Sequence, residues 1–164
     1  MDRVAIEELF AFTEFSWGEY EDLIRPSGDE LLTTPAPGSG WPALGDALSH
    51  MCWAHVRWLA DPDRTTAEPE PRWRTWVELE TYRRRVIEHD RRYLDSLDDE
   101  ELLRPREMDV DGDPIAYRPA DIFVHTFLHE RQHHGDLNTL LYQLGVEVPI
   151  VEFRFSLPER RLER

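Results

Sequence analysis

Residues 125–135, which read HTFLHERQHHG, contain four of the seven histidines of this 164-residue chain. His125, His129 and His133 follow one another at intervals of four residues. In an α-helix, four residues turn by about 400° and rise by about 6 Å, so side chains at this interval lie above one another on one face. The stretch therefore predicts a helix with stacked imidazoles. Imidazole is a common protein ligand of Zn²⁺, Ni²⁺ and similar ions, and two such rings could hold one ion.

The histidines belong to a longer helical pattern, from about residue 119 to residue 144, with Gly145 as its expected C-terminal cap. Steps of three and four residues place one set of side chains toward a core: Ile122, Thr126, His129, His133, Leu137, Leu140 and Leu144. Because an imidazole is costly to bury without a partner, His129 and His133 indicate a shared ion or a hydrogen-bonded pair. His125 with His129 is the alternative pair. This alternative is disfavoured, because His129 and His133 both occupy core-facing positions and His125 does not. His125 is therefore expected on the surface or in a cleft.

Three further segments show a helical period, at about residues 4–24, from residue 41 to residue 60, and at about residues 73–97. Residues 98–118 are irregular, and the Asp-Gly sequence at 111–112 indicates a short hairpin. The tail, at about residues 149–164, has no assigned structure. The sequence therefore predicts one domain over residues 1–164 with an all-α fold, a four-helix bundle with long loops and a short hairpin before the last helix. The arginines at positions 83–85, 91 and 92 are expected on a solvent-exposed face.

The composition narrows the classes of partner. The net charge of −15 disfavours nucleic acids and anionic membranes. A single cysteine excludes an internal disulfide and indicates a reducing cytoplasm. The N-terminus has no signal-peptide pattern, and no apolar run approaches the length of a membrane span. We therefore expect a cytoplasmic protein that binds neither nucleic acids nor membranes.

A metal ion held by two histidines of one helix needs a third ligand from another helix. His50 is the first candidate, because Ala43, Ala47 and Ala54 share its helical face and leave space over its imidazole. His55 is a weaker candidate, since it points about 140° away, and His89 is expected on the surface. Three histidine ligands would leave a coordination position open, as in catalytic sites. An ion there could lower the pKa of a bound water or thiol, or polarise a carbonyl.

Residues 129–133 also match the HExxH pattern of zinc proteases, in which Glu130 would be the general base. The extended form of that pattern has a glycine three residues after the second histidine and another histidine three residues later. Here Gly135 comes two residues after His133, and Thr139 stands in place of the histidine. In a bundle, Glu130 is expected to point away from the two ligands and into solvent. The protease interpretation is therefore disfavoured.

Other chemically capable residues have simpler interpretations. Cys52 is expected to be a small core residue rather than a nucleophile. The acidic residues at 68, 70 and 98–100 are expected to be solvated loop residues. Asp90 and Glu80 are candidates for a hydrogen bond that orients a ligand histidine.

Three segments of the chain resemble the DinB/YfiT-like superfamily of four-helix-bundle metalloproteins. They are residues 44–50 followed by Ala54 and Trp58-Leu59, residues 94–103, and residues 125–135 followed by Leu144-Gly145 and Pro149. The resemblance covers nearly the whole chain in order and spacing. It implies His50, His129 and His133 as ligands of a divalent metal ion, most simply Zn or Ni. The family commonly has Arg-Gly-Gln after the last ligand, where this chain has His134-Gly135-Asp136.

Characterised members of the superfamily include S-transferases and isomerases that use a low-molecular-weight thiol such as bacillithiol or mycothiol. Members are often dimeric. The resemblance therefore implies a metal-dependent thiol S-transferase that acts on an electrophilic small molecule, with the thiol as co-substrate and a possible homodimer. Two alternatives stay open. One is a metal-dependent hydrolase, and the other is a non-catalytic site that clamps helices together or acts as a sensor.

Overall fold

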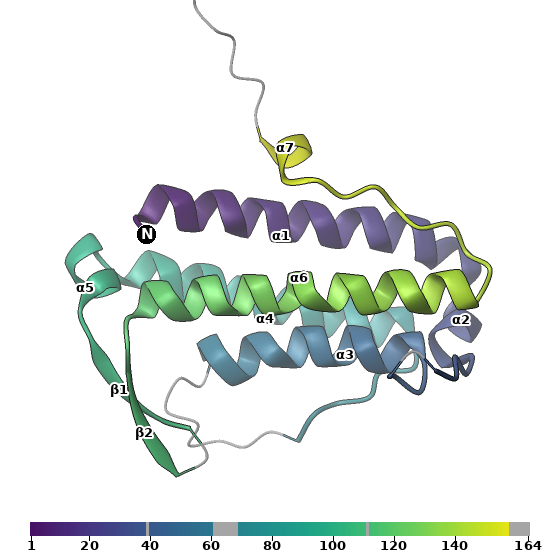
Figure 1. The fold of residues 1–164 in the computed structure, drawn as a ribbon, viewed down its shortest axis with the longest axis horizontal. Helices are drawn as coiled ribbons and strands as arrows, with labels where there is room; N and C mark the ends of the chain where they lie inside the picture. The colour runs from purple at the N-terminus through teal and green to yellow at the C-terminus, as the bar shows by residue number, and fades with distance from the viewer. Residues whose placement is uncertain (39, 61–68, 111, 158–164) are drawn as a thin grey trace, which may run out of the picture.

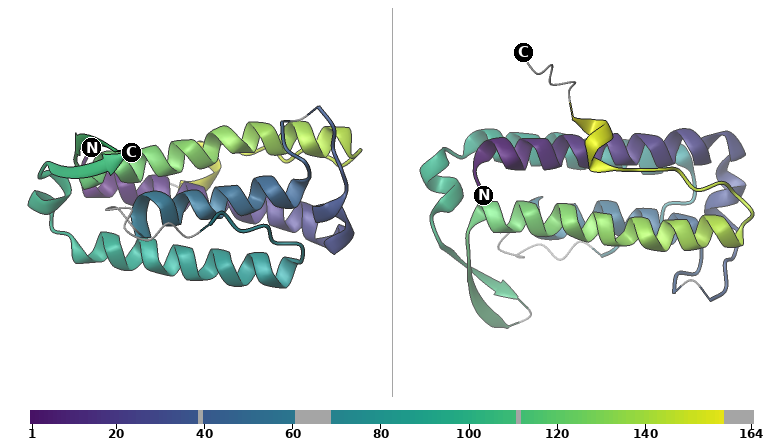
Figure 2. Two further views of the ribbon diagram at one scale, coloured as in Figure 1. Left: turned by 90° about the horizontal axis from the view of Figure 1, so that it is seen from below. Right: turned by 45° about the horizontal axis from the view of Figure 1, so that its top comes forward.

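The structure, a computed structural model, describes residues 1–38, 40–60, 69–110 and 112–157. In this part of the chain, four long helices lie side by side along the long axis of the molecule (Figure 1). They are α1 (Arg3–Ile24), α3 (Leu44–His55), α4 (Trp76–Ser96) and α6 (Pro119–Gln143). The two views of Figure 2 show the same four helices packed as a bundle. The predicted all-α fold is confirmed.

Short elements connect the long helices. η1 (Arg25–Ser27) and α2 (Asp29–Thr33) follow α1, a π-helical turn η2 (Val56–Ala60) continues α3, and α5 (Asp99–Leu103) follows α4. The strands β1 (Arg106–Val110) and β2 (Asp113–Tyr117) form the predicted antiparallel hairpin before α6. In the tail, α7 (Phe153–Ser156) lies beside α1 (Figure 1). The predicted helix stop at residues 61–63, and Asp111 of the predicted turn, lie outside the described residues.

The second long helix begins later than its sequence pattern predicts. The pattern places Trp41 and Pro42 in the first helical turn, but α3 begins at Leu44. Pro35 and Ala43 instead pair in an isolated antiparallel bridge, and the Ala36 N–H donates to the carbonyl of Pro42 at 3.2 Å. The loop between α2 and α3 is thereby closed at its base, next to Trp41.

Side-chain caps determine where several helices begin. At the start of α1, Asp2 Oδ1 accepts a hydrogen bond from the Ala5 N–H at 2.9 Å. At the start of α4, Thr75 Oγ1 accepts from the Glu78 N–H at 3.3 Å, and Asp98 begins α5 with a capping box. These bonds satisfy N–H groups that have no carbonyl partner in a first helical turn.

The core has two apolar clusters with buried polar groups between them. One cluster lies toward the α2 end of the bundle and includes Tyr20, Leu79 and Leu140. The other lies toward the hairpin end and includes Phe10 and Phe123. Along α3 and α6, the buried side chains of His55 and Glu130 lie between the two clusters. No helix of the described ranges is both long and apolar enough to span a membrane.

The first prediction concerns Gly45, which lets α3 approach its neighbours. A Cβ at this position would lie 2.8 Å from the carbonyl oxygen of Leu32 and 3.0 Å from that of Trp73. We expect Gly45→Ala to lower the free energy of unfolding by roughly 1–3 kcal/mol, because backbone would have to move. Gly18→Ala in α1 is the control, since nothing lies within 4 Å of a Cβ there. It should raise stability by about 0.5–1 kcal/mol through helix propensity. Urea denaturation measures both, and equal effects would contradict the close approach.

Candidate metal centre

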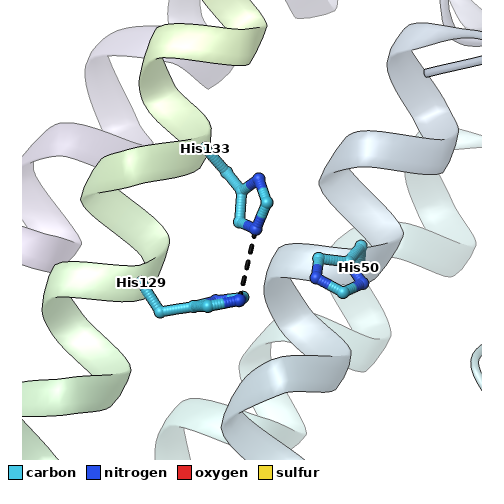
Figure 3. A group of neighbouring side chains, drawn as sticks. All are labelled: His50, His129 and His133. Carbon is cyan, nitrogen blue, oxygen red and sulfur yellow. Dashed lines mark hydrogen bonds between the residues drawn. The ribbon is translucent and has the colours of Figure 1, made fainter. Parts of the chain in front are cut away.

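Three histidines from two helices point toward one another (Figure 3). His129 and His133 come from α6 and His50 comes from α3. One potential ligand atom from each ring lies within 4.8 Å of the other two. The Nε2 atoms of His129 and His133 are 3.3 Å apart, and the ring centroid of His50 is 5.4 Å from that of His129 and 4.8 Å from that of His133. The structure thus brings together the three residues that the family resemblance implies as ligands.

Carboxylates orient two of the three rings. His133 Nδ1 is 2.7 Å from Asp136 Oδ2, and this oxygen also accepts a hydrogen bond from Trp41 Nε1–H at 3.0 Å. His50 Nδ1 is 3.0 Å from Glu70 Oε1. Because a carboxylate only accepts, each Nδ1 carries the proton, and Nε2 of a neutral ring keeps its lone pair. Such carboxylate–histidine pairs are typical of metal ligands.

His129 differs from the other two because its Nδ1 is buried and has no hydrogen-bond partner among the described residues. Burial, together with the nearby rings of His133 and His50, lowers the pKa of His129 to about 4. The ring is therefore neutral at physiological pH, which is the form that binds metals. Three imidazole nitrogens fit a divalent ion such as Zn²⁺ or Ni²⁺. The donor set is compatible with a divalent metal site, and it does not identify the ion.

The two orienting carboxylates were not found by sequence reasoning. The sequence pattern assigns Glu70 to a solvated loop, yet its carboxylate reaches His50 across 20 residues of chain. Asp136 could have been found, since it follows His133 by three residues and so lies one helical turn away. Of the two candidates named for this role, Asp90 does orient a histidine, but this is His55, outside the cluster. Glu80 pairs with Arg25 at 2.8 Å instead.

Three of the four remaining histidines, His125, His89 and His134, lie outside the cluster. His125 is exposed, and its ring centroid is 6.0 Å from that of His129 and 4.3 Å from the ring of Trp58. His89 is partly exposed on α4. His134 is buried, stacks on Tyr20 and receives no hydrogen bond at Nε2 from the described residues. None of the three is placed to join His50, His129 and His133 on one ion.

Glu130 lies in the core, which corrects the expectation that it points into solvent. Its carboxylate is 1% exposed, and Oε2 accepts hydrogen bonds from His55 Nε2 and Arg83 Nη1, both at 2.7 Å. Arg83, expected among exposed arginines, is buried as well and also pairs with Glu14 at 2.9 Å. Periodicity failed here because α6 packs against both α3 and α1, so more than one of its faces is buried, and Glu130 reaches Arg83 of α4 across the core. Glu130 is therefore not free to act as the base of an HExxH protease.

His55 is a buried cation in this network. Its Nδ1 is 2.6 Å from Asp90 Oδ2, and its Nε2 is 2.7 Å from Glu130 Oε2. Both neighbours are acceptors, so both ring nitrogens carry protons. Burial alone would lower the pKa of His55, but the charges and hydrogen bonds of Asp90 and Glu130 outweigh it and raise the pKa to about 9. The same contacts hold the pKa of Asp90 below its ordinary value against the effect of burial.

Cys52 is a core residue, as predicted. Its side chain is fully buried. Burial raises the pKa of the thiol to about 12, which the nearby charge of Arg83 only partly offsets. The thiol is therefore protonated at physiological pH and is not a nucleophile.

A model of the DinB family matches residues 3–161, which is nearly the whole chain. Neither the curated proteins nor the solved structures contain a match to this chain.

The second prediction concerns pH and the buried cation. Because the pKa of His55 is raised from 6.5 to about 9 on folding, its contribution to stability is complete below pH 6.5 and is lost as the pH rises through 9. The metal-free protein should therefore lose about 3 kcal/mol of unfolding free energy between pH 6.5 and pH 9.5. Urea denaturation in the presence of a chelator measures this loss.

The matched controls for this prediction are two histidine variants. His89→Gln, at a partly exposed position, should keep the wild-type pH dependence. His55→Asn should be less stable at pH 6.5, because it leaves Asp90 and Glu130 without their shared cation, and its stability should vary less with pH. A wild-type protein whose stability is constant from pH 6.5 to pH 9.5 would show that His55 is neutral.

Proposed function

This chain belongs to the DinB family, and we propose that it is a divalent-metal-dependent S-transferase. Its substrates would be a low-molecular-weight thiol and an electrophilic small molecule. The observation that carries the proposal is the convergence of His50, His129 and His133. All three rings have a neutral form with a nitrogen lone pair available, and two of them are oriented by carboxylates. The cytoplasmic setting, the absence of nucleic-acid and membrane partners, and a homodimer belong to the same proposal.

The proposed ligands are His50, His129 and His133, and Zn or Ni suits three imidazole donors. A divalent ion held there supplies Lewis acidity, which lowers the pKa of a thiol that reaches it. Asp136 and Glu70 keep His133 and His50 in the tautomer that directs Nε2 inward. Three protein ligands leave a coordination position for a substrate, as catalytic sites do.

Access to the cluster supports a catalytic role over a purely structural one. The side chain of His50 is 19% exposed, and His129 is half-buried. In the proposed reaction, the S–H bond of the thiol breaks and its proton goes to solvent. A new S–C bond forms at the electrophilic carbon, whose leaving group departs with its bonding electrons. The buried thiol of Cys52 takes no part, because burial keeps it protonated.

Two other functions are compatible with the same cluster. A hydrolase would use water in place of the thiol, but Glu130 could not be its base, because Arg83 and His55 occupy that carboxylate. A structural or sensory clamp would join α3 to α6 through the same ligands and would need no open position. The three functions differ in their response to added thiol, which makes them separable by experiment.

The third prediction is the metal content of purified untagged protein. We expect about one Zn or Ni ion per chain by elemental analysis, and none after His50→Ala, His129→Ala or His133→Ala. Asp136→Asn should weaken metal binding by roughly 10–100-fold, as loss of an orienting carboxylate does elsewhere. His89→Ala is the control and should keep its metal. Unchanged metal in the three alanine variants, or none in the reconstituted wild type, would refute the site.

The fourth prediction tests the reaction class with a cobalt-substituted protein. Adding bacillithiol, mycothiol or cysteine should produce a sulfur-to-cobalt charge-transfer band, and an electrophile should then be consumed only when thiol is present. His133→Ala should abolish both the band and the reaction, whereas His89→Ala should abolish neither. Turnover of an ester or amide without thiol would favour a hydrolase. A protein that melts on chelation and shows no band with any thiol would favour a clamp.

A further inference from the structure

Aromatic rings surround the histidine cluster. Trp41 lies with its ring centroid 5.0 Å from His50 and 5.4 Å from His133. Trp53 lies 5.9 Å from His50. Trp58 lies 4.3 Å from His125, which in turn is 6.0 Å from His129. Trp41 and Trp53 therefore lie beside the cluster, and Trp58 lies beside the neighbouring His125.

These tryptophans differ from those in the core. Trp17 and Trp76 are 7% and 6% exposed, and both belong to the apolar cluster at the α2 end. Trp41, Trp53 and Trp58 are each half-buried. A half-buried indole presents part of its ring to whatever enters beside the histidines. Large, rigid aromatic side chains of this kind supply much of the contact area in ligand sites.

The backbone at Trp58 is also unusual. Trp58 lies in η2, where the helix that begins as α3 continues as a π-helical turn. A π turn bonds residue i to residue i+5, so it alters the direction in which the following side chains project. Such turns occur frequently at functional sites. Here the turn carries the ring that contacts His125, one helical turn from the candidate ligand His129.

The charge around the cluster restricts the ligand further. Among the described residues, the three histidines form hydrogen bonds, ion pairs and ring contacts with other histidines, with tryptophans and with two carboxylates, Glu70 and Asp136. No arginine is among these partners. An anionic substrate would therefore meet two carboxylates, in a chain of net charge −15, and the buried cation His55 is already paired with Asp90 and Glu130. A neutral molecule avoids that repulsion.

We propose that the electrophilic substrate is a neutral, planar, electron-poor ring that carries a leaving group, such as a halonitroaromatic, and that it binds beside the histidines among Trp41, Trp53 and Trp58. This inference rests on the proposed function and specifies its substrate class. The face of an indole ring is electron-rich, so it attracts an electron-poor ring in an offset stack. The same electron deficiency makes a ring carbon open to attack by sulfur. Recognition and reactivity thus depend on one property of the ligand.

The test is binding of 1,3-dinitrobenzene to the full-length, zinc-loaded protein. This probe is neutral, planar and electron-poor, and it has no halide leaving group, so binding is measured without thiol and without turnover. The chain has six tryptophans, and each gives one indole N–H signal in a ¹⁵N-labelled sample. Single Trp→Phe variants assign them. We expect the signals of Trp41, Trp53 and Trp58 to shift on titration and those of Trp17 and Trp76 to stay.

The indole signal of Trp73 distinguishes the proposed site from a second groove that the probe could occupy. Trp73, Val77 and Tyr82 line a groove of about 430 Å³ beside α4. A probe that shifts the Trp73 signal and leaves Trp41, Trp53 and Trp58 unchanged binds there instead, which would overturn the proposal. Two further ligands test the chemistry. Nitrocyclohexane, which is not planar, and 3-nitrobenzoate, which is anionic, should both bind more weakly than 1,3-dinitrobenzene, and equal binding of all three would also overturn it.

Variants separate ring contacts from effects on folding. Trp53→Leu and Trp58→Leu should each weaken binding of 1,3-dinitrobenzene by roughly 2–10-fold, the loss expected for one aromatic pair. Zinc content should be unchanged, because neither residue supplies a ligand. Tyr142→Leu, at an 81% exposed aromatic position on α6, is the matched control and should bind as the wild type does. Unaltered affinity in both tryptophan variants would refute the inference.

The binding experiment and the thiol-transfer experiment can fail independently. If the probe binds beside the three tryptophans but no thiol is ever transferred, the substrate-class inference stands for another reaction, and the S-transferase proposal fails. If thiol is transferred to aliphatic electrophiles while 1,3-dinitrobenzene does not bind, the S-transferase proposal stands, and this inference fails.

Discussion

The rest of the structure depends on a small set of charges that are buried together at the middle of the bundle. His55 from α3, Asp90 and Arg83 from α4, and Glu130 from α6 share hydrogen bonds of 2.6–2.7 Å where no solvent competes. A buried charge without its partner costs several kcal/mol, so these helices can pack only in the register that pairs all four groups. The apolar clusters on either side tolerate a shift in helix register much better, because the hydrophobic effect is not directional.

This register also determines where the candidate ligands point. Glu130 directly follows His129 in α6, so the rotation that aims Glu130 at His55 and Arg83 also sets the direction of His129. His133, one turn later, follows the same rotation. Both rings then face α3, where His50 meets them. The buried charges and the histidine cluster therefore depend on the same orientation of α6. A change that rotates this helix displaces both.

Much of this arrangement could be predicted from the sequence, for identifiable reasons. The long helices follow from apolar periodicity, the hairpin from Asp-Gly, and the pairing of His129 with His133 from their four-residue spacing. The buried pairs could not be predicted, because a lone Arg83 or Glu130 in a periodic pattern looks the same whether it meets water or a counter-charge. The hydrogen bond between Glu70 and His50 could not be predicted for another reason. It joins a loop to a helix, and no local spacing encodes such a contact.

The loop between α2 and α3 has a consequence for how such a site can diversify. Its ends are tied by the Pro35–Ala43 bridge, and buried Ala36 anchors it to the apolar cluster at the α2 end. Trp41, beside that tie, hydrogen-bonds Asp136 and packs on His50 and His133. A substitution of Trp41 can therefore alter what lies over the histidines while the buried charges of His55, Asp90, Arg83 and Glu130 stay as they are. During evolution, substitutions at Trp41 can therefore change substrate selectivity with little effect on the folding of the bundle.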